Sequence, residues 1–134
     1  MIIVVDTSAL VAVLLREPEA DALSSLLVAA SPVISAGSLI ELYRVMTLRR
    51  GATMQREIDD LLAQLQMQVA VVDRAQAALA ADGQRRFGKG RHQPPAVLNF
   101  GDLFAYALAR HLDAPLLFKG DDFSKTDVKP AVAG

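Results

Sequence analysis

The sequence predicts an α/β fold with a mostly parallel sheet, and two observations support this prediction. Short apolar runs alternate with longer stretches in which apolar residues recur at helical spacing. The runs are rich in Val, Ile and Leu, which is typical of parallel strands buried on both faces. The chain has 134 residues, which fits a single domain over residues 1–134, and it contains no internal repeat or linker.

The individual elements follow from these periods and from the residues that end them. The expected strands are residues 2–5, 32–35, 69–72 and 116–118. The expected helices are residues 9–15, 18–28, 38–50, 53–65, 74–86 and 100–112. Two glycines, two prolines and several basic residues make residues 88–97 a loop. The pattern does not fix the order of the strands in the sheet.

Composition excludes several classes of protein. With 14 Lys and Arg against 15 Asp and Glu, the net charge is -1, so nucleic acid cannot be held by a surface that is basic all over. The absence of cysteine excludes a disulfide scaffold, a thiolate zinc site and a cysteine nucleophile. No apolar run is long enough to span a membrane, and the N-terminus lacks the basic segment of a signal peptide. We therefore expect a cytoplasmic protein that is not bound to a membrane.

Acidic residues stand where a ligand site is expected. Ligands of open parallel sheets bind outside the carboxyl ends of the strands. Asp6 follows the first strand, and Asp121 and Asp122 follow the last one. Glu41 and Asp102 lie near the starts of two helices and, like Asp6, interrupt apolar stretches where an unpaired carboxylate would be costly.

These acids predict a divalent metal site. Carboxylates held close together cannot all ionise without a cation among them. Oxygen ligands without cysteine or paired histidines indicate Mg²⁺ or Mn²⁺ rather than zinc, and such an ion suits hydrolysis of a phosphodiester by a bound water. Taken singly, each acid also has a structural explanation. Asp6 and Asp102 could be helix N-caps, Asp121 and Asp122 could form a turn, and Glu41 could be solvated.

Residues 85–92 form a basic segment that leads towards Asp102. Its basic side chains are Arg85, Arg86, Lys89, Arg91 and His92, and no acidic residue lies between Asp82 and Asp102. Alone, this segment could be a solvated loop that follows a helix end. Beside an acidic site it is better explained as a clamp on the phosphates of a nucleic acid.

Four motifs in this order resemble a known family. They are Asp6-Thr7-Ser8-Ala9, Glu41 in a mid-chain helix, Asn99-Phe100-Gly101-Asp102 and Gly120-Asp121-Asp122-Phe123. Together they resemble a PIN domain and, more narrowly, the VapC toxins of VapBC toxin–antitoxin pairs. The segments 88–92 and 116–127 are typical of one VapC group. The resemblance spans nearly the whole chain.

The resemblance implies an α/β/α sandwich with a mostly parallel sheet and a Mg²⁺- or Mn²⁺-dependent endoribonuclease. It also implies homodimerisation and inhibition by a VapB-type antitoxin. Asp6, Glu41 and Asp102 match the first three acids of the family. The fourth is Asp121 or Asp122, and Asp122 is favoured because the motif centres on Asp-Phe. Thr7, Ser8 and Asn99 would support the site.

Other functions remain open from the residues alone. One alternative is another metal-dependent phosphohydrolase with Asp6 as nucleophile, although such enzymes generally have a second Asp where this chain has Ser8. A second is a non-catalytic PIN-like binding module, which would usually have lost one or more acids. A third is that the carboxylates never converge. The apolar surfaces of residues 18–28 and 38–65 could belong either to the core or to a partner interface.

Overall fold

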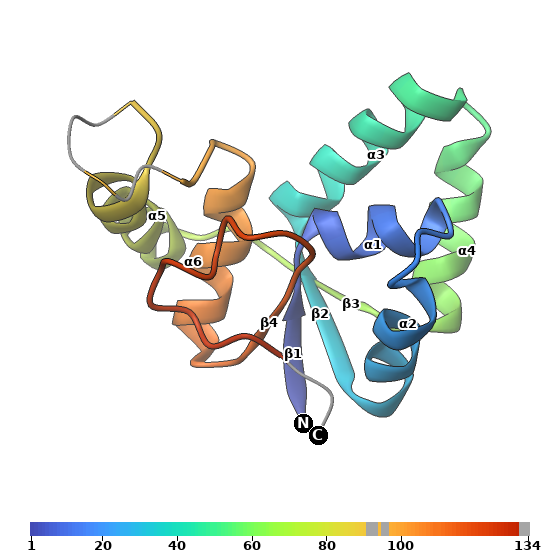
Figure 1. Ribbon diagram of the computed structural model, residues 1–134, viewed down its shortest axis with the longest axis horizontal. Coiled ribbons are helices and arrows are strands. Elements are labelled where there is room, and N and C mark those ends of the chain that lie inside the picture. The colour runs from blue at the N-terminus through green and yellow to red at the C-terminus, as the bar shows by residue number, and fades with distance from the viewer. Residues whose placement is uncertain (91–93, 95–96, 132–134) are drawn as a thin grey trace.

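The computed structural model describes residues 1–90, 94 and 97–131 of the chain (Figure 1). Its strands are β1 (Ile2–Val5), β2 (Ser31–Ser35), β3 (Gln68–Ala70) and β4 (Leu116–Leu117). Its helices are α1 (Thr7–Leu14), α2 (Ala20–Ala29), α3 (Ala36–Arg50), α4 (Met54–Gln64), α5 (Arg74–Phe87) and α6 (Asp102–Leu112). Every strand and helix expected from the sequence is present, with ends that differ by a few residues.

The sheet is fully parallel, and its strand order is β3-β2-β1-β4. The central strand β1 pairs with β2 and β4, so that Val4 lies opposite both Val33 and Leu116. The carboxyl ends of β1 and β4 therefore meet at one edge of the sheet. This arrangement brings Asp6 and the residues that follow Leu117 together, although they are far apart in the sequence.

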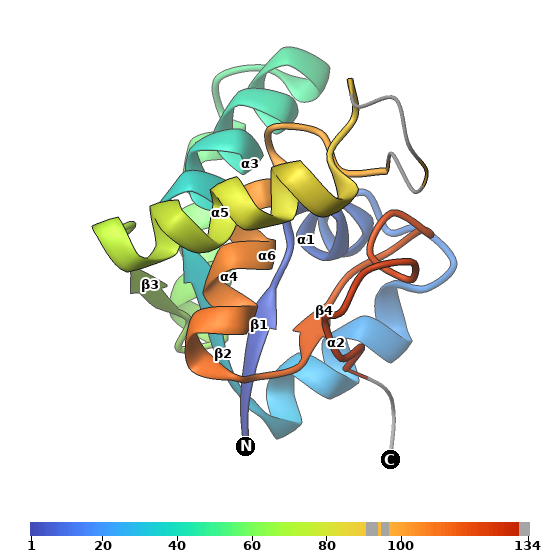
Figure 2. The ribbon, with the colours of Figure 1, turned by 90° about the vertical axis from the view of Figure 1, so that its left-hand side faces the viewer.

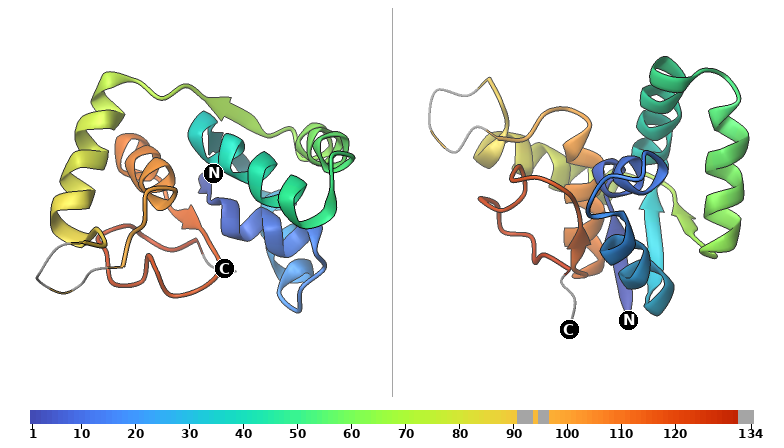
Figure 3. Two further views of the ribbon diagram at one scale, coloured as in Figure 1. Left: turned by 90° about the horizontal axis from the view of Figure 1, so that it is seen from above. Right: turned by 45° about the vertical axis from the view of Figure 1, so that its right-hand side comes forward.

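Helices cover both faces of the sheet, which confirms the predicted α/β/α sandwich. Helices α5 and α6 lie on one face and α1 to α4 on the other (Figures 1 and 3), and α5 crosses the outer side of α6 (Figure 2). Along β1, Ile3 and Val5 join the core beneath α1 to α4, whereas Val4 joins the core beneath α5 and α6. This alternation follows from the two-residue period of a strand. It explains why the run is apolar at every position.

The strand predicted as buried over residues 69–72 is shorter and more exposed than expected. Strand β3 ends at Ala70 and pairs only with β2, at the edge of the sheet. Val69, Val71 and Val72 keep 47%, 74% and 43% of their surface exposed. Because β3 lies at the edge of the sheet and Val71 and Val72 lie beyond its end, an apolar sequence alone did not ensure burial. No helix in the described part of the chain is long and apolar enough to cross a membrane.

Candidate active site

The two carboxylate oxygens of Asp6 differ in their hydrogen bonding. It is the N-cap of α1, where Oδ2 accepts hydrogen bonds from the Ser8 backbone N–H at 3.0 Å and the Ser8 hydroxyl at 2.6 Å. The N-cap explanation is thus correct for this oxygen. The other oxygen, Oδ1, is buried and has no hydrogen-bond partner among the described residues. A buried carboxylate oxygen without a donor is costly, so Oδ1 is suited to a ligand.

Asp102 is the first residue of α6 rather than its N-cap, which is Gly101. Its Oδ2 accepts a hydrogen bond of 3.0 Å from the Asn99 backbone N–H. In return, the Asn99 side-chain oxygen accepts a hydrogen bond of 3.0 Å from the Asp102 backbone N–H. Asn99, expected as a supporting residue, therefore orients Asp102 directly.

Glu41 lies in α3 and extends towards the start of α6. A Cβ atom built on Gly101 would lie 1.7 Å from Oε2 of Glu41, so the carboxylate occupies space that only a glycine leaves free. Helix α3 is connected to α1 by the buried Thr7, whose hydroxyl donates a hydrogen bond of 3.0 Å to the Ser38 carbonyl. Thr7 therefore uses its hydroxyl to join α1, which Asp6 caps, to α3, which carries Glu41.

The three acids line one pocket of about 270 Å³. The lining residues are Asp6, Thr7, Ser8, Val11, Glu17, Glu41, Val45, Asp102 and Lys119. Asp6, Glu41 and Asp102 thus share one pocket, as the metal-site interpretation requires. The amine of Lys119 forms ion pairs with Glu17 and with Glu19, the latter at 3.0 Å. The sequence interpretation missed Lys119, although its place just after β4 satisfies the rule that identified Asp6.

The electrostatics of the pocket oppose ionisation of its acids. Burial raises the pKa of Asp6 to about 6 and the charge of Glu41 adds to this, whereas the hydrogen bonds from Ser8 act in the opposite direction. Burial also raises the pKa of Asp102 to about 7, with further contributions from the charges of Asp6, Asp122 and Glu41. A bound cation would relieve this repulsion.

These residues fit a hard divalent cation with an incomplete protein shell. Among the described residues, no three His, Asp or Glu side chains already surround a single point as metal ligands. Mg²⁺, however, is usually bound by one or two carboxylates and keeps several waters. The unpaired Oδ1 of Asp6, with Asp102 and Glu41 in the same pocket, supplies donors of that kind.

The two acids that follow β4 differ in their surroundings. Both are exposed. The Asp121 carbonyl accepts hydrogen bonds from the Ser124 backbone N–H at 3.1 Å and the Ser124 hydroxyl at 2.7 Å, as expected for a turn. The charge of Asp122 is among those that raise the pKa of Asp102, which places Asp122 within electrostatic reach of the pocket.

Two arginines of the basic segment form ion pairs with acidic residues. Arg85 pairs with Asp82, and Arg86 pairs with Asp82 at 3.2 Å and with Asp127 at 3.0 Å. Lys89 is exposed, and its backbone N–H donates a hydrogen bond of 2.7 Å to the Leu98 carbonyl, next to Asn99. The middle of the segment thus lies beside Asn99, which orients Asp102. Arg91 and His92 lie outside the described residues.

Comparison with known proteins gives a family and close relatives. The model of the PIN domain family matches residues 3–129. Ribonuclease VapC42 of Mycobacterium tuberculosis is 42% identical over 129 residues, which cover 96% of this chain and 98% of the relative. Ribonuclease VapC of Mycolicibacterium smegmatis is 46% identical over 127 residues, which cover 93% and 96%.

Solved structures share the fold at low sequence identity. VapBC2 from Rickettsia felis, bound to a DNA fragment from its promoter, has a TM-score of 0.77 at 16% identity and covers 98% of each chain. The sarcin-ricin loop cleaving toxin VapC20 of Mycobacterium tuberculosis has a TM-score of 0.71 at 16% identity and covers 96% of this chain and 98% of its own. With a family match over nearly its whole length and relatives above 40% identity, the chain belongs to the PIN domain family and to its VapC group.

Proposed function

We propose that the chain is a Mg²⁺- or Mn²⁺-dependent endoribonuclease that hydrolyses RNA phosphodiester bonds and serves as the toxin of a VapBC pair. The observation that carries this proposal is the buried, unpaired Oδ1 of Asp6 in a pocket shared with Asp102 and Glu41. The ribonuclease names of its relatives support the same chemistry.

The acidic residues would have different roles in the site. Asp6 and Asp102 would hold the cation, directly or through water, because they are the most buried acids of the pocket. When bound, the ion would act as a Lewis acid towards a phosphate oxygen and would lower the pKa of a bound water. Glu41 and Asp122 would complete the site or orient the attacking water. Asn99 and Ser8 would keep the two main ligands in place through the hydrogen bonds described above.

A cleavage assay with matched variants tests this proposal. Labelled RNA is incubated with the purified chain and Mg²⁺, Mn²⁺ or EDTA, and Asp6→Asn and Asp102→Asn are compared with Asp60→Asn on the exposed side of α4. Cleavage is expected to require the metal and to fall on the order of a hundred-fold in the first two variants. Undiminished cleavage in both would contradict the proposal. A phosphorylated Asp6 would favour the phosphohydrolase alternative instead.

RNA would approach along the basic segment. Lys89 is exposed close to Asn99, and Arg85 keeps three quarters of its side chain exposed (75%) despite its pairing with Asp82. Arg91 and His92 remain predicted contacts from the sequence. Because the net charge is only -1, such local contacts must supply the attraction to a polyanion.

A VapB-type antitoxin is the proposed inhibitor, because several structural neighbours are toxin–antitoxin complexes. Of the helix faces considered from the sequence, Leu23 and Leu42 lie in the core, whereas Val28 and Ile40 are exposed. The exposed side chains remain available to an antitoxin or to a second copy in a homodimer. Light scattering is expected to give twice the 14.4 kDa of the chain, and co-expressed antitoxin should abolish cleavage. We expect RNA cleavage and its inhibition by the antitoxin to take place in the cytoplasm.

A further inference from the structure

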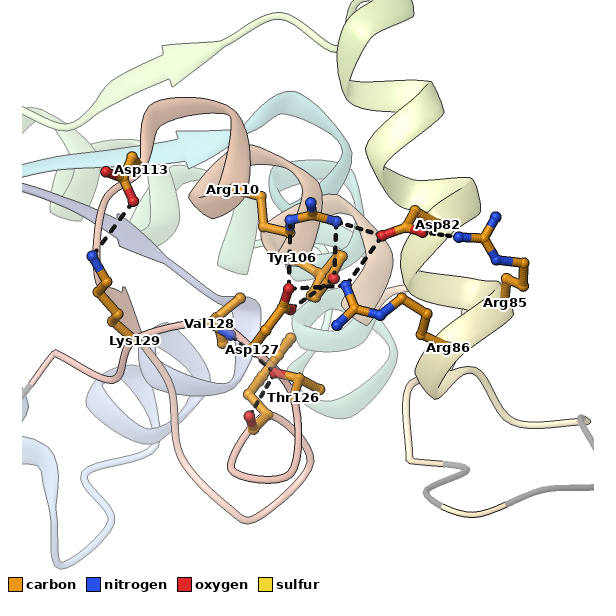
Figure 4. Close-up of polar contacts among 11 residues, drawn as sticks. Asp82, Arg85, Arg86, Tyr106, Arg110, Asp113, Thr126, Asp127, Val128 and Lys129 are labelled. Atoms are coloured by element: carbon orange, nitrogen blue, oxygen red, sulfur yellow. Dashed lines mark hydrogen bonds and ion pairs between the residues drawn. The ribbon is translucent and has the colours of Figure 1, made fainter.

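A network of charged side chains joins α5, α6 and the C-terminal loop, residues 118–131 (Figure 4). We call it the Asp127 network; its members are Asp82, Arg86, Tyr106, Arg110 and Asp127. One carboxylate oxygen of Asp127 accepts a hydrogen bond of 2.8 Å from the Tyr106 hydroxyl, and the other accepts one of 3.0 Å from Arg86. On the far side, Arg110 donates a hydrogen bond of 2.6 Å to Asp82.

The rigid member of the Asp127 network is Tyr106. Tyr106 is fully buried, and its ring contacts the Phe87 ring edge to face with centroids 6.1 Å apart. Its hydroxyl donates to Asp127 and accepts a hydrogen bond of 3.2 Å from Arg110. A partly buried carboxylate held by a fixed hydroxyl and by guanidinium groups has little freedom to move. Asp127 therefore anchors the C-terminal loop to the helical layer.

Further contacts within the C-terminal loop connect Asp127 with the pocket. The Thr126 hydroxyl donates a hydrogen bond of 2.7 Å to the Phe123 carbonyl, and Phe123 is buried against Phe118 with ring centroids 5.2 Å apart. Asp122 directly precedes Phe123. Near the start of the loop, the Lys119 backbone N–H donates a hydrogen bond of 3.0 Å to the Ser8 hydroxyl beside Asp6. The turn that carries Asp122 is thus fixed from both sides.

We propose that Asp127 is a positioning residue that, through Tyr106, Arg86 and Arg110, holds the C-terminal loop so that Asp122 stays beside the carboxylate pocket. This inference rests on the proposed function, because it takes Asp122 as an acid of the metal site. It also gives Arg86 a different task from the one expected from the sequence. Arg86 helps to assemble the site, and RNA is held by other basic residues.

Hydrogen exchange tests the anchoring without any activity measurement. In Asp127→Asn and Tyr106→Phe, the loop amides of Ser124 and Thr126 should exchange roughly ten-fold faster than in wild type, while amides of β1 and β2 keep their protection. The matched control is Asp113→Asn. It removes the same charge from a pair between the end of α6 and Lys129 of the same loop, but both partners are exposed, at 89% and 73%. A surface pair of this kind contributes little, so its exchange should equal wild type.

A double-mutant cycle tests the connection with Asp122. Asp127→Asn should slow RNA cleavage roughly ten-fold, the effect typical of losing a residue that orients a metal ligand. In an Asp122→Asn background the same change should add no further loss, because its target is already removed. Additive losses, or unchanged exchange in the loop, would overturn the inference. A wild-type chain that cleaves no RNA while Asp127→Asn still loosens the loop would instead refute the proposed function and support the anchoring.

Discussion

The Ser8 hydroxyl donates a hydrogen bond of 2.6 Å to Oδ2 of Asp6, and together with the Ser8 backbone N–H it engages this oxygen and leaves Oδ1 without a partner among the described residues. The same hydroxyl accepts a hydrogen bond from the Lys119 backbone N–H just after β4. Ser8 therefore connects the two strand ends that form the pocket. A residue that looked like a simple helix-start signal in the sequence orients the central acid of the site.

Replacing Ser8 by alanine should impair cleavage more than folding. Asp6 would lose the hydroxyl that orients it and helps to keep its pKa from rising further. We expect cleavage to fall roughly ten-fold, with the loss partly recovered at high Mn²⁺ concentration, because oriented ligands bind metal more tightly. The measurement is cleavage rate against Mn²⁺ concentration. Ser8→Thr, which keeps a hydroxyl, is the control and should retain most activity. Equal losses in both variants would contradict this role.

The raised pKa values of Asp6 and Asp102 predict how the stability of the metal-free protein depends on pH. The folded state holds these protons more tightly than the unfolded state, in which an aspartate has a pKa of 3.8. Their contribution to stability is therefore full below about pH 4. It is lost as pH rises through about 6 for Asp6 and about 7 for Asp102, at up to about 1.4 kcal/mol per pH unit for each proton.

Urea denaturation in EDTA between pH 5 and 8 measures this dependence. The free energy of unfolding should fall across the range in wild type and fall less steeply in Asp102→Asn, which should be the more stable of the two at pH 8. Adding Mg²⁺ at pH 8 should stabilise wild type, since a ligand that binds only the folded state shifts the equilibrium towards it. A wild-type stability that rises from pH 5 to 8 in EDTA would contradict the assignment.

The sequence singled out the acids that line the pocket because strand ends and apolar context are local signals. Asp6 ends a run of β-branched residues, and Asp102 interrupts an apolar helix start. Apart from the pair of Asp82 and Arg86 four residues apart on α5, the Asp127 network carries no such signal. Arg86 and Asp127 are 41 residues apart, and Arg110 and Asp82 are 28 apart, so their pairing depends on how α5, α6 and the C-terminal loop pack. Taken locally, each of these residues is an ordinary surface charge.

The basic segment is a second case in which the sequence alone did not distinguish the residues. A count of positive charges treats Arg86 and Lys89 alike. The structure pairs Arg86 with two acids and leaves Lys89 exposed. One partner of Arg86, Asp82, lies four residues earlier on α5 and forms a local pair, whereas the other, Asp127, is a tertiary partner that no local pattern contains.

This difference between Arg86 and Lys89 can be measured by RNA binding. In the inactive Asp6→Asn background, Lys89→Gln should weaken binding and reduce the dependence of log K on log salt by about 0.7, the value for one phosphate contact to a single strand. Arg86→Gln removes the same charge but should leave the salt dependence close to that of Asp6→Asn alone. A filter-binding series over several salt concentrations gives both slopes. Equal changes in the two variants would mean that Arg86 contacts RNA as well.

Gly101 allows the placement of Glu41 to be tested separately from the fold. Its φ of −61° suits any residue, and the only strong clash of an added Cβ is with the end of the flexible Glu41 side chain, at 1.7 Å. Gly101→Ala should therefore displace the carboxylate at little cost in stability and lower cleavage about as much as Glu41→Gln. The double variant should lose no more than either single one. Gly37→Ala is the contrasting case, because its Cβ would lie 2.2 Å from the Phe104 ring, and overpacking there should cost about 1–3 kcal/mol of unfolding free energy. If Gly101→Ala cleaves RNA like wild type, Glu41 does not need its observed position to act.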